Sequence, residues 1–183
     1  MRYLKTYEEI ITLDLDDSDK MTLLTNGLNN GKVKLVKDIL SSGIDPNTLS
    51  QTHNLPILLD EITKDKPNLE MIQMIIDSSA DVNFMVNGNT PIICCSIYYI
   101  KSATHKGKLL EIIRKMLRAG ADLFVVSKSF PYNDFFGYLE IQKNRNYITQ
   151  AFIDKLMKII KEESPEQYDK YHIMIAAKKY NVF

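Results

Sequence analysis

Three stretches of the chain repeat the same order of apolar and polar residues at a nearly constant spacing. They start at Thr22, Leu55 and Thr90, so the starts lie 33 and 35 residues apart. A period of this length is typical of repeat proteins, in which each unit buries its apolar face against the next unit. The repeat therefore constrains the fold more strongly than any other feature of the sequence.

Each stretch has a short apolar segment, a polar break and a second segment with apolar residues three and four positions apart, which is the spacing of one helix face. The residues on these faces are Val33, Val36, Ile39 and Leu40; Leu69, Ile72, Ile75 and Ile76; and Leu109, Ile112, Ile113, Met116 and Leu117. A fainter fourth start lies at Phe130 and Pro131. The pattern predicts a helix, a turn, a second helix and a loop in each unit.

The ends of the segments carry the residues that helix ends favour. Gly43 and Gly120 stand just past a predicted second helix, where a left-handed cap suits glycine. Pro56, Pro91 and Pro131 stand where a helix can begin. These residues support helix boundaries that agree with the repeat.

The loops after the second helices have related sequences: GIDPN at 43–47, SADVN at 79–83 and GADL at 120–123. Together with NGNTPI at 87–92, they resemble the ankyrin repeat, which has a period of about 33 residues and similar motifs. The resemblance implies an all-α fold, a solenoid of about four helix-turn-helix units with helical N- and C-terminal caps and short β-hairpin fingers. It implies little about the partner, since ankyrin arrays bind many unrelated proteins.

We expect one domain over residues 1–183, with an N-cap at 1–20, a C-cap helix at 164–183 and repeats at 21–54, 55–89, 90–128 and 129–163. In the N-cap, TYEE at 6–9 has the pattern of a capping box, and Asp19 is expected to cap the next helix. In the C-cap, SPEQ at 164–167 predicts Ser164 as N-cap, Pro165 at the first helical position and Gln167 reaching back.

Composition excludes several classes of partner and compartment. Lys plus Arg equal Asp plus Glu at 23 each, and a nucleic-acid binder usually shows a basic excess, so we expect no nucleic-acid partner. The longest apolar stretch, PIICCSIYYI, is about ten residues, whereas a bilayer span needs roughly 20, so we expect no membrane association. No export signal is visible at the acidic N-terminus, and the chain is expected to be cytoplasmic with reduced thiols.

No constellation of residues predicts catalysis, a metal site or a cofactor site. The three histidines, His53, His105 and His172, fall in separate units. The two cysteines, Cys94 and Cys95, are read as small core residues, and nothing in the sequence holds Cys95 against His105 as a nucleophile and base would require. We therefore expect no enzyme, with an enzyme subunit as a remote alternative.

The predicted fingers differ in polarity. An Asn-Gly pair at 87–88 predicts a tight type I′ turn, and the residues before it are apolar, as are those at 124–126, whereas the finger at 48–54 is polar. These apolar residues either pack against neighbouring fingers or form an exposed surface for a partner. The expected partner-binding residues are Phe84, Met85, Val86, Tyr98, Tyr99, Val125, Val126 and Tyr132, and Phe135 could extend their surface.

The expected function is binding of another protein, which the chain would sequester or inhibit through its fingers and concave helix face. Usage rich in Ile, Lys, Asn and Tyr suggests an AT-rich genome, and short divergent ankyrin proteins of such genomes include viral or bacterial proteins that bind host factors. The alternatives are an immunity protein that neutralises a bacterial toxin and a structural adaptor. We expect a monomer before the partner binds, and a host cytoplasmic or nuclear location for a viral or effector protein.

Overall fold

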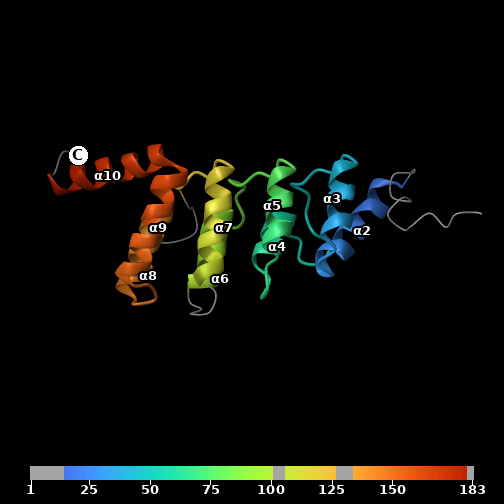
Figure 1. Ribbon diagram of the computed structural model, residues 1–183, viewed down its shortest axis with the longest axis horizontal. Coiled ribbons are helices and arrows are strands. Elements are labelled where there is room, and N and C mark those ends of the chain that lie inside the picture. The colour runs from blue at the N-terminus through green and yellow to red at the C-terminus, as the bar shows by residue number, and fades with distance from the viewer. Residues whose placement is uncertain (1–14, 101–105, 127–133, 181–183) are drawn as a thin grey trace, which may run out of the picture. The chain divides into compact units, whose positions relative to one another are not determined.

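The computed structural model describes residues 15–100, 106–126 and 134–180, and within these ranges the chain forms α-helices and no strand (Figure 1). This confirms the prediction of an all-α fold. The chain divides into two compact units, Met1–Asp81 and Val82–Phe183. The predicted capping box at 6–9 and the predicted helix start at Pro131 lie outside the described residues.

The first unit contains four described helices: α2 (Asp17–Asn29), α3 (Val33–Ser41), α4 (Ile57–Ile62) and α5 (Leu69–Asp77). Helix α2 packs against α3, α4 packs against α5, and α3 packs against α5. Val36, Ile39 and Leu40 on one face of α3 are buried, as their helical spacing predicts. Each pair is joined by a short loop, so the order of helix, turn and helix follows the predicted units.

Gly27 allows α2 and α3 to approach each other closely. A Cβ atom at this position would lie 2.7 Å from Cγ2 of Val36, whose side chain is fully buried and, being branched at Cβ, has little rotational freedom. A glycine inside a helix costs roughly 0.5–1 kcal/mol relative to alanine. The close packing of the two helices explains why α2 nevertheless carries a glycine here.

Side chains cap the starts of α2 and α5. The Asp16 carboxylate accepts a hydrogen bond from the Asp19 backbone N–H at 2.8 Å, so Asp16 is the N-cap of α2. The prediction that Asp19 is the cap is wrong, because the helix starts earlier and Asp19 lies in its first turn, where a negative charge is also favourable. At α5, Asn68 Oδ1 accepts hydrogen bonds from the backbone N–H groups of Glu70 and Met71.

The second unit contains five described helices: α6 (Pro91–Ile100), α7 (Lys106–Arg118), α8 (Phe135–Asn144), α9 (Gln150–Glu163) and α10 (Pro165–Lys179). Helix α6 packs against α7 and α8, while α9 packs against α7 and α10. First helices thus contact first helices and second helices contact second helices, which is a stacked arrangement. The predicted apolar face of α7 is buried at every position, namely Leu109, Ile112, Ile113, Met116 and Leu117.

Helices α3, α5 and α7 are each followed by a residue in the left-handed region. Gly43 has φ 97°, Ser79 has φ 71° and Gly120 has φ 86°. The two glycine caps were predicted and are confirmed. Ser79 adopts the same conformation with a Cβ atom, at a cost of roughly 1–2 kcal/mol, so the shape of this exit is retained where the glycine is missing.

Asparagine side chains bind the backbone of the next exit loop in both units. In the first unit, Asn47 Oδ1 accepts a hydrogen bond from the Asp81 N–H at 2.7 Å. In the second unit, Asn83 Oδ1 accepts one from the Asp122 N–H at 2.7 Å, and Asn83 Nδ2 donates to the Gly120 carbonyl at 3.1 Å. Both asparagines occupy the last position of the GIDPN and SADVN motifs, so the motif has a defined structural role.

Gln167 makes the corresponding contact from α10. Its Nε2 donates to the Ala121 carbonyl and its Oε1 accepts from the Leu123 N–H, both at 2.7 Å. The prediction that Gln167 reaches back to cap its own helix is therefore wrong, since its amide is used in a tertiary contact. Ser164 precedes α10 without a side-chain capping bond, and Pro165 is the first helical residue, as predicted.

Replacing Asn83 with alanine is expected to lower the free energy of unfolding by about 1–2 kcal/mol, because two hydrogen bonds to the exit loop are lost at a partly exposed position. Urea unfolding followed by far-UV circular dichroism measures the change. The matched control is Asn144→Ala at the exposed end of α8, for which a change within about 0.5 kcal/mol is expected. Equal losses in the two variants would show that the Asn83 contacts contribute nothing.

Candidate functional site

The Asn-Gly pair forms the tight turn that the sequence predicts. Asn87 has φ 49° and Gly88 has φ 79°, so both central residues are left-handed, as a type I′ turn requires. Val86 and Asn89 exchange two backbone hydrogen bonds of 2.9 Å and form an isolated antiparallel bridge. In the first finger, Leu49 and Pro56 form the other described bridge. The described residues contain these two isolated bridges and no strand, so the predicted β-hairpin fingers are not confirmed.

The three apolar residues before this turn differ in exposure. The Met85 residue is 37% exposed, whereas Phe84 and Val86 are half-buried. Side chains alternate in direction along extended backbone, so a partner could reach one of the three more readily than its neighbours. Met85 thus faces solvent, while the residues beside it pack partly against protein, and binding of a partner by these residues stays a prediction.

The two neighbouring tyrosines of α6 occupy different environments. Tyr98 is 45% exposed, but Tyr99 is fully buried, and their rings meet edge to face with centroids 5.2 Å apart. This corrects the prediction for Tyr99, because a side chain inside the core presents no surface to a partner. Only Tyr98 of this pair stays a candidate for binding.

The apolar residues after α7 also divide between core and surface. Val126 is 58% exposed and Val125 is half-buried. Phe124 packs against Phe136 with centroids 5.2 Å apart, and the Lys170 ammonium lies 4.1 Å from the Phe124 centroid. Phe135, which was expected to extend the surface, is fully buried, and Tyr132 lies outside the described residues.

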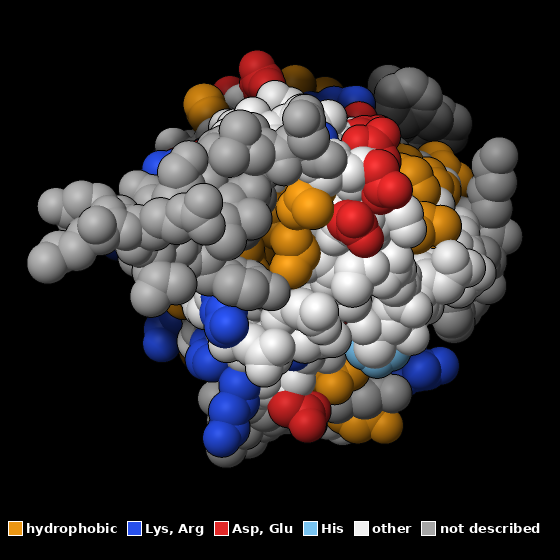
Figure 2. Space-filling view, turned by 90° about the vertical axis from the view of Figure 1, so that its right-hand side faces the viewer, with side chains coloured by type: hydrophobic (Ala, Val, Ile, Leu, Met, Phe, Trp, Pro, Cys, Tyr) orange, Lys and Arg blue, Asp and Glu red, His pale blue; other side chains and the backbone are white. Residues whose placement is uncertain are grey.

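The remaining candidates come from three segments of the second unit: the turn before α6, helix α6 itself and the residues after α7. They are Met85, Tyr98 and Val126. Methionine and tyrosine are well suited to binding surfaces, because methionine adapts its shape and tyrosine combines a large apolar ring with a polar hydroxyl. On the face of the molecule that Figure 2 shows, the apolar side chains lie in small groups among charged and other polar side chains.

Helix α10 carries exposed apolar residues that the sequence reasoning missed. Ile173 is 68% exposed, Ile175 is 44% exposed and Tyr180 at the end of the helix is 71% exposed. The sequence predicted this helix only as the C-terminal cap of the repeats. A signal was present in the run IMIAA at 173–177, which has no polar face and therefore differs from an ordinary surface helix.

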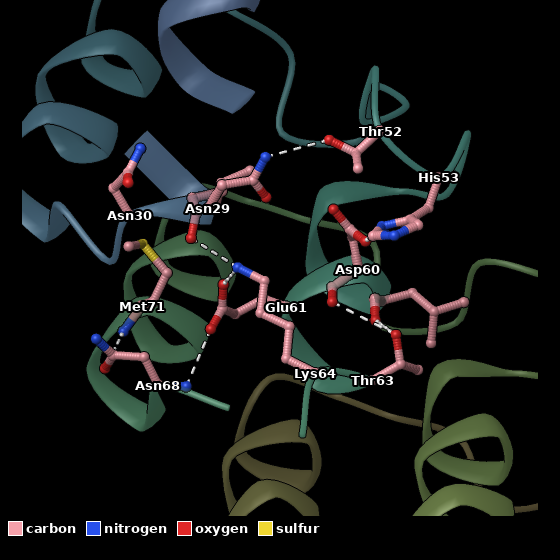
Figure 3. Close-up of polar contacts among 12 residues, drawn as sticks. Asn29, Asn30, Thr52, His53, Asp60, Glu61, Thr63, Lys64, Asn68 and Met71 are labelled. Atoms are coloured by element: carbon pink, nitrogen blue, oxygen red, sulfur yellow. Dashed lines mark hydrogen bonds and ion pairs between the residues drawn. The ribbon is translucent and has the colours of Figure 1, made fainter. Parts of the chain in front are cut away.

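The first unit contains a polar network around two buried carboxylates of α4 (Figure 3). Glu61 is 2% exposed; its Oε2 lies 2.5 Å from Lys64 Nζ, and its Oε1 accepts a hydrogen bond from the Asn68 N–H at 2.9 Å. Lys64 Nζ also donates to the Leu28 carbonyl at 2.7 Å. The network thus joins the end of α2, the short helix α4 and the start of α5.

Asp60, the other buried carboxylate, is 3% exposed and lies with its Oδ1 2.6 Å from His53 Nδ1. A carboxylate beside a histidine can orient a catalytic base. Here the Ser50 hydroxyl accepts a hydrogen bond from the His53 backbone N–H instead of bonding to its ring. The pair holds the loop before α4 against that helix, and we assign it a structural role.

The two thiols are poor nucleophiles. Cys95 is fully buried, as predicted, while Cys94 is half-buried, and both are free. Burial raises the pKa of the Cys94 thiol to about 11 and raises the pKa of Cys95 above its ordinary range. Both groups are therefore protonated at neutral pH, and the reactive thiolate is scarce.

Within residues 15–100, 106–126 and 134–180, no group of three or more His, Cys, Asp or Glu side chains could hold a metal ion. His105, one half of the pair considered in the sequence, lies outside these ranges. The described helices are all too short or too polar to cross a bilayer. No family model, curated protein or solved structure matches the chain.

Proposed function

We propose that the chain is a divergent ankyrin-repeat protein that binds another protein without catalysis. The observation that carries this proposal is the exposure of Met85, Tyr98 and Val126 on three segments of the second unit. Contact of such apolar side chains with water is unfavourable in free energy, and a partner that covers them would remove this cost. Buried in an interface, each would contribute about 1.5–3 kcal/mol if it were fully covered.

The ankyrin assignment rests on local features that recur along the chain. Helix pairs alternate with exits through left-handed residues, namely Gly43, Ser79 and Gly120. The last residue of each asparagine-ending motif binds the exit loop of the following pair. In a repeat array each unit contacts its neighbours. The bonds from an asparagine of one exit loop to the backbone of the next exit loop would provide such a contact.

The proposal favours binding over catalysis because several chemically capable side chains of the described residues have structural partners or are protonated. Asp60 holds His53, Glu61 holds Lys64 and the α5 start, and the two thiols are protonated. A stoichiometric binder acts by occupying a surface that its partner needs. The same mechanism would serve a protein that sequesters a host factor and one that neutralises a toxin, and the identity of the partner distinguishes the two.

The proposal is tested by replacing Tyr98 with a photoreactive phenylalanine analogue and irradiating the chain in a lysate of its native host. We expect one predominant cross-linked protein, identified by mass spectrometry, because Tyr98 is expected to lie inside the interface. The matched control carries the same analogue at Tyr147, which is 43% exposed and lies between α8 and α9. The same cross-linked set from both positions, or none from Tyr98, would contradict the proposal.

A further inference from the structure

The chain contains three Asn-Gly pairs, at 26–27, 30–31 and 87–88. An asparagine that precedes glycine is open to a reaction that needs no enzyme, because glycine has no Cβ atom to shield its backbone nitrogen. That nitrogen attacks Cγ of the asparagine side chain, and ammonia leaves. The segment must rotate into the geometry of a five-membered ring, so the structure around each pair decides how readily it reacts.

The pair at 26–27 is held inside helix α2. Gly27 is buried, and its backbone packs so closely that a Cβ atom there would lie 2.7 Å from Val36 of α3. An N–H group inside an α-helix is bonded to the carbonyl four residues earlier. Ring closure at Asn26 would therefore break α2 and its packing against α3.

The pair at 30–31 closes the end of the same helix. The Asn30 Nδ2 group donates a hydrogen bond to the Asn26 carbonyl at 2.8 Å, and the Gly31 N–H donates one to the Leu28 carbonyl at 3.4 Å. The carboxamide that would be attacked and the nitrogen that would attack it are thus both hydrogen-bonded. Reaction at this pair requires the end of α2 to unravel.

The pair at 87–88 differs from the other two because its attacking nitrogen is not hydrogen-bonded. Asn87 is exposed, and the Gly88 N–H donates no hydrogen bond within the part of the chain that the structure describes. Two backbone bonds between Val86 and Asn89 close the turn. The turn must open for the ring to form, and this opening breaks an isolated bridge while the helices stay intact.

We propose that Asn87 is a site of spontaneous deamidation, and that its pair is the most reactive of the three in the folded chain. The Gly88 nitrogen bonds to Asn87 Cγ and gives up its proton, while the side-chain nitrogen leaves as ammonia, so that a succinimide forms. Water then adds to one of the two ring carbonyls and opens the ring. The product is aspartate or isoaspartate at position 87, and water is the one added reactant.

The reaction changes the turn in charge and in backbone length. Both products carry a negative charge at an exposed position that was neutral. Isoaspartate also routes the main chain through the former side chain and lengthens it by a carbon atom, so the bridge between Val86 and Asn89 loses its register. Met85 lies close by in sequence. An effect on partner binding therefore rests on the proposed function, whereas the deamidation itself does not.

Peptide mapping by mass spectrometry tests the proposal after incubation of the full chain at mildly alkaline pH, with Asn26 and Asn30 as internal controls. In the folded chain we expect conversion at Asn87 to be at least about tenfold faster than at either control, because it needs only local opening. The chain unfolded in urea is the matched reference. There the three pairs are expected to react at similar rates, since none is held by structure.

The Asn87→Gly variant provides a second test. It keeps the left-handed turn, because glycine adopts positive φ readily, and it removes the reacting side chain. We expect it to lose the isoaspartate that the folded wild type accumulates, as measured with an isoaspartyl methyltransferase assay. Conversion at Asn26 or Asn30 that equals or exceeds conversion at Asn87 would overturn the proposal, and so would isoaspartate that Asn87→Gly leaves unchanged.

Discussion

Replacing Glu61 with alanine is expected to lower the free energy of unfolding by about 3 kcal/mol or more. Glu61 is 2% exposed and is the partner of both Lys64 Nζ and the Asn68 N–H. Removing one member of a buried ion pair typically costs about 3–5 kcal/mol, because the other charge loses its partner and cannot be fully hydrated. Lys64 keeps some access to water, which places the expected loss at the lower end.

Urea unfolding followed by circular dichroism measures this change, with two companion variants. Glu61→Gln keeps an oxygen for the Asn68 N–H but loses the charge, so an intermediate loss is expected. Glu70→Ala removes an exposed carboxylate from the neighbouring helix α5 and is expected to cost less than about 1 kcal/mol. A loss for Glu61→Ala that is no larger than the loss for Glu70→Ala would show that the network does not stabilise the unit.

The helices and their exits could be predicted because their signals are local. Apolar residues three and four positions apart identify a buried helix face whatever that face contacts, as for Ile112 and Met116 of α7. Gly43 and Gly120 mark left-handed exits, since glycine adopts positive φ with little strain. The Asn-Gly turn follows from the same property, and its position fixes the residues that precede α6.

The sequence did not predict side-chain environments that depend on contacts distant in the chain. Gln167 fits a capping box, but its amide binds the exit loop after α7, which lies more than 40 residues away in sequence. Tyr98 and Tyr99 have the same chemistry, and a single helical step decides which one is buried. Asp60 and Glu61 received no assignment from the sequence, and their burial depends on loops whose course the sequence does not reveal.

Replacing Met85 and Tyr98 together with serine is expected to weaken binding of the partner by about 2–3 kcal/mol, roughly 30- to 160-fold in affinity. Both side chains are partly exposed in the free chain, and an interface would remove their apolar atoms from water. Serine keeps the backbone and removes most of that area. The fold should tolerate the change, since neither residue belongs to the buried core.

The most direct test of the account is calorimetric titration of the cross-linked partner, once purified, with the wild type, the Met85→Ser Tyr98→Ser variant and the control Leu49→Ser. Leu49 is 42% exposed and belongs to the first unit, so its replacement removes a similar exposed apolar side chain elsewhere. The account predicts stoichiometric binding that the double variant weakens by roughly 30-fold or more and the control leaves unchanged. Equal affinity of the double variant and the wild type would contradict it.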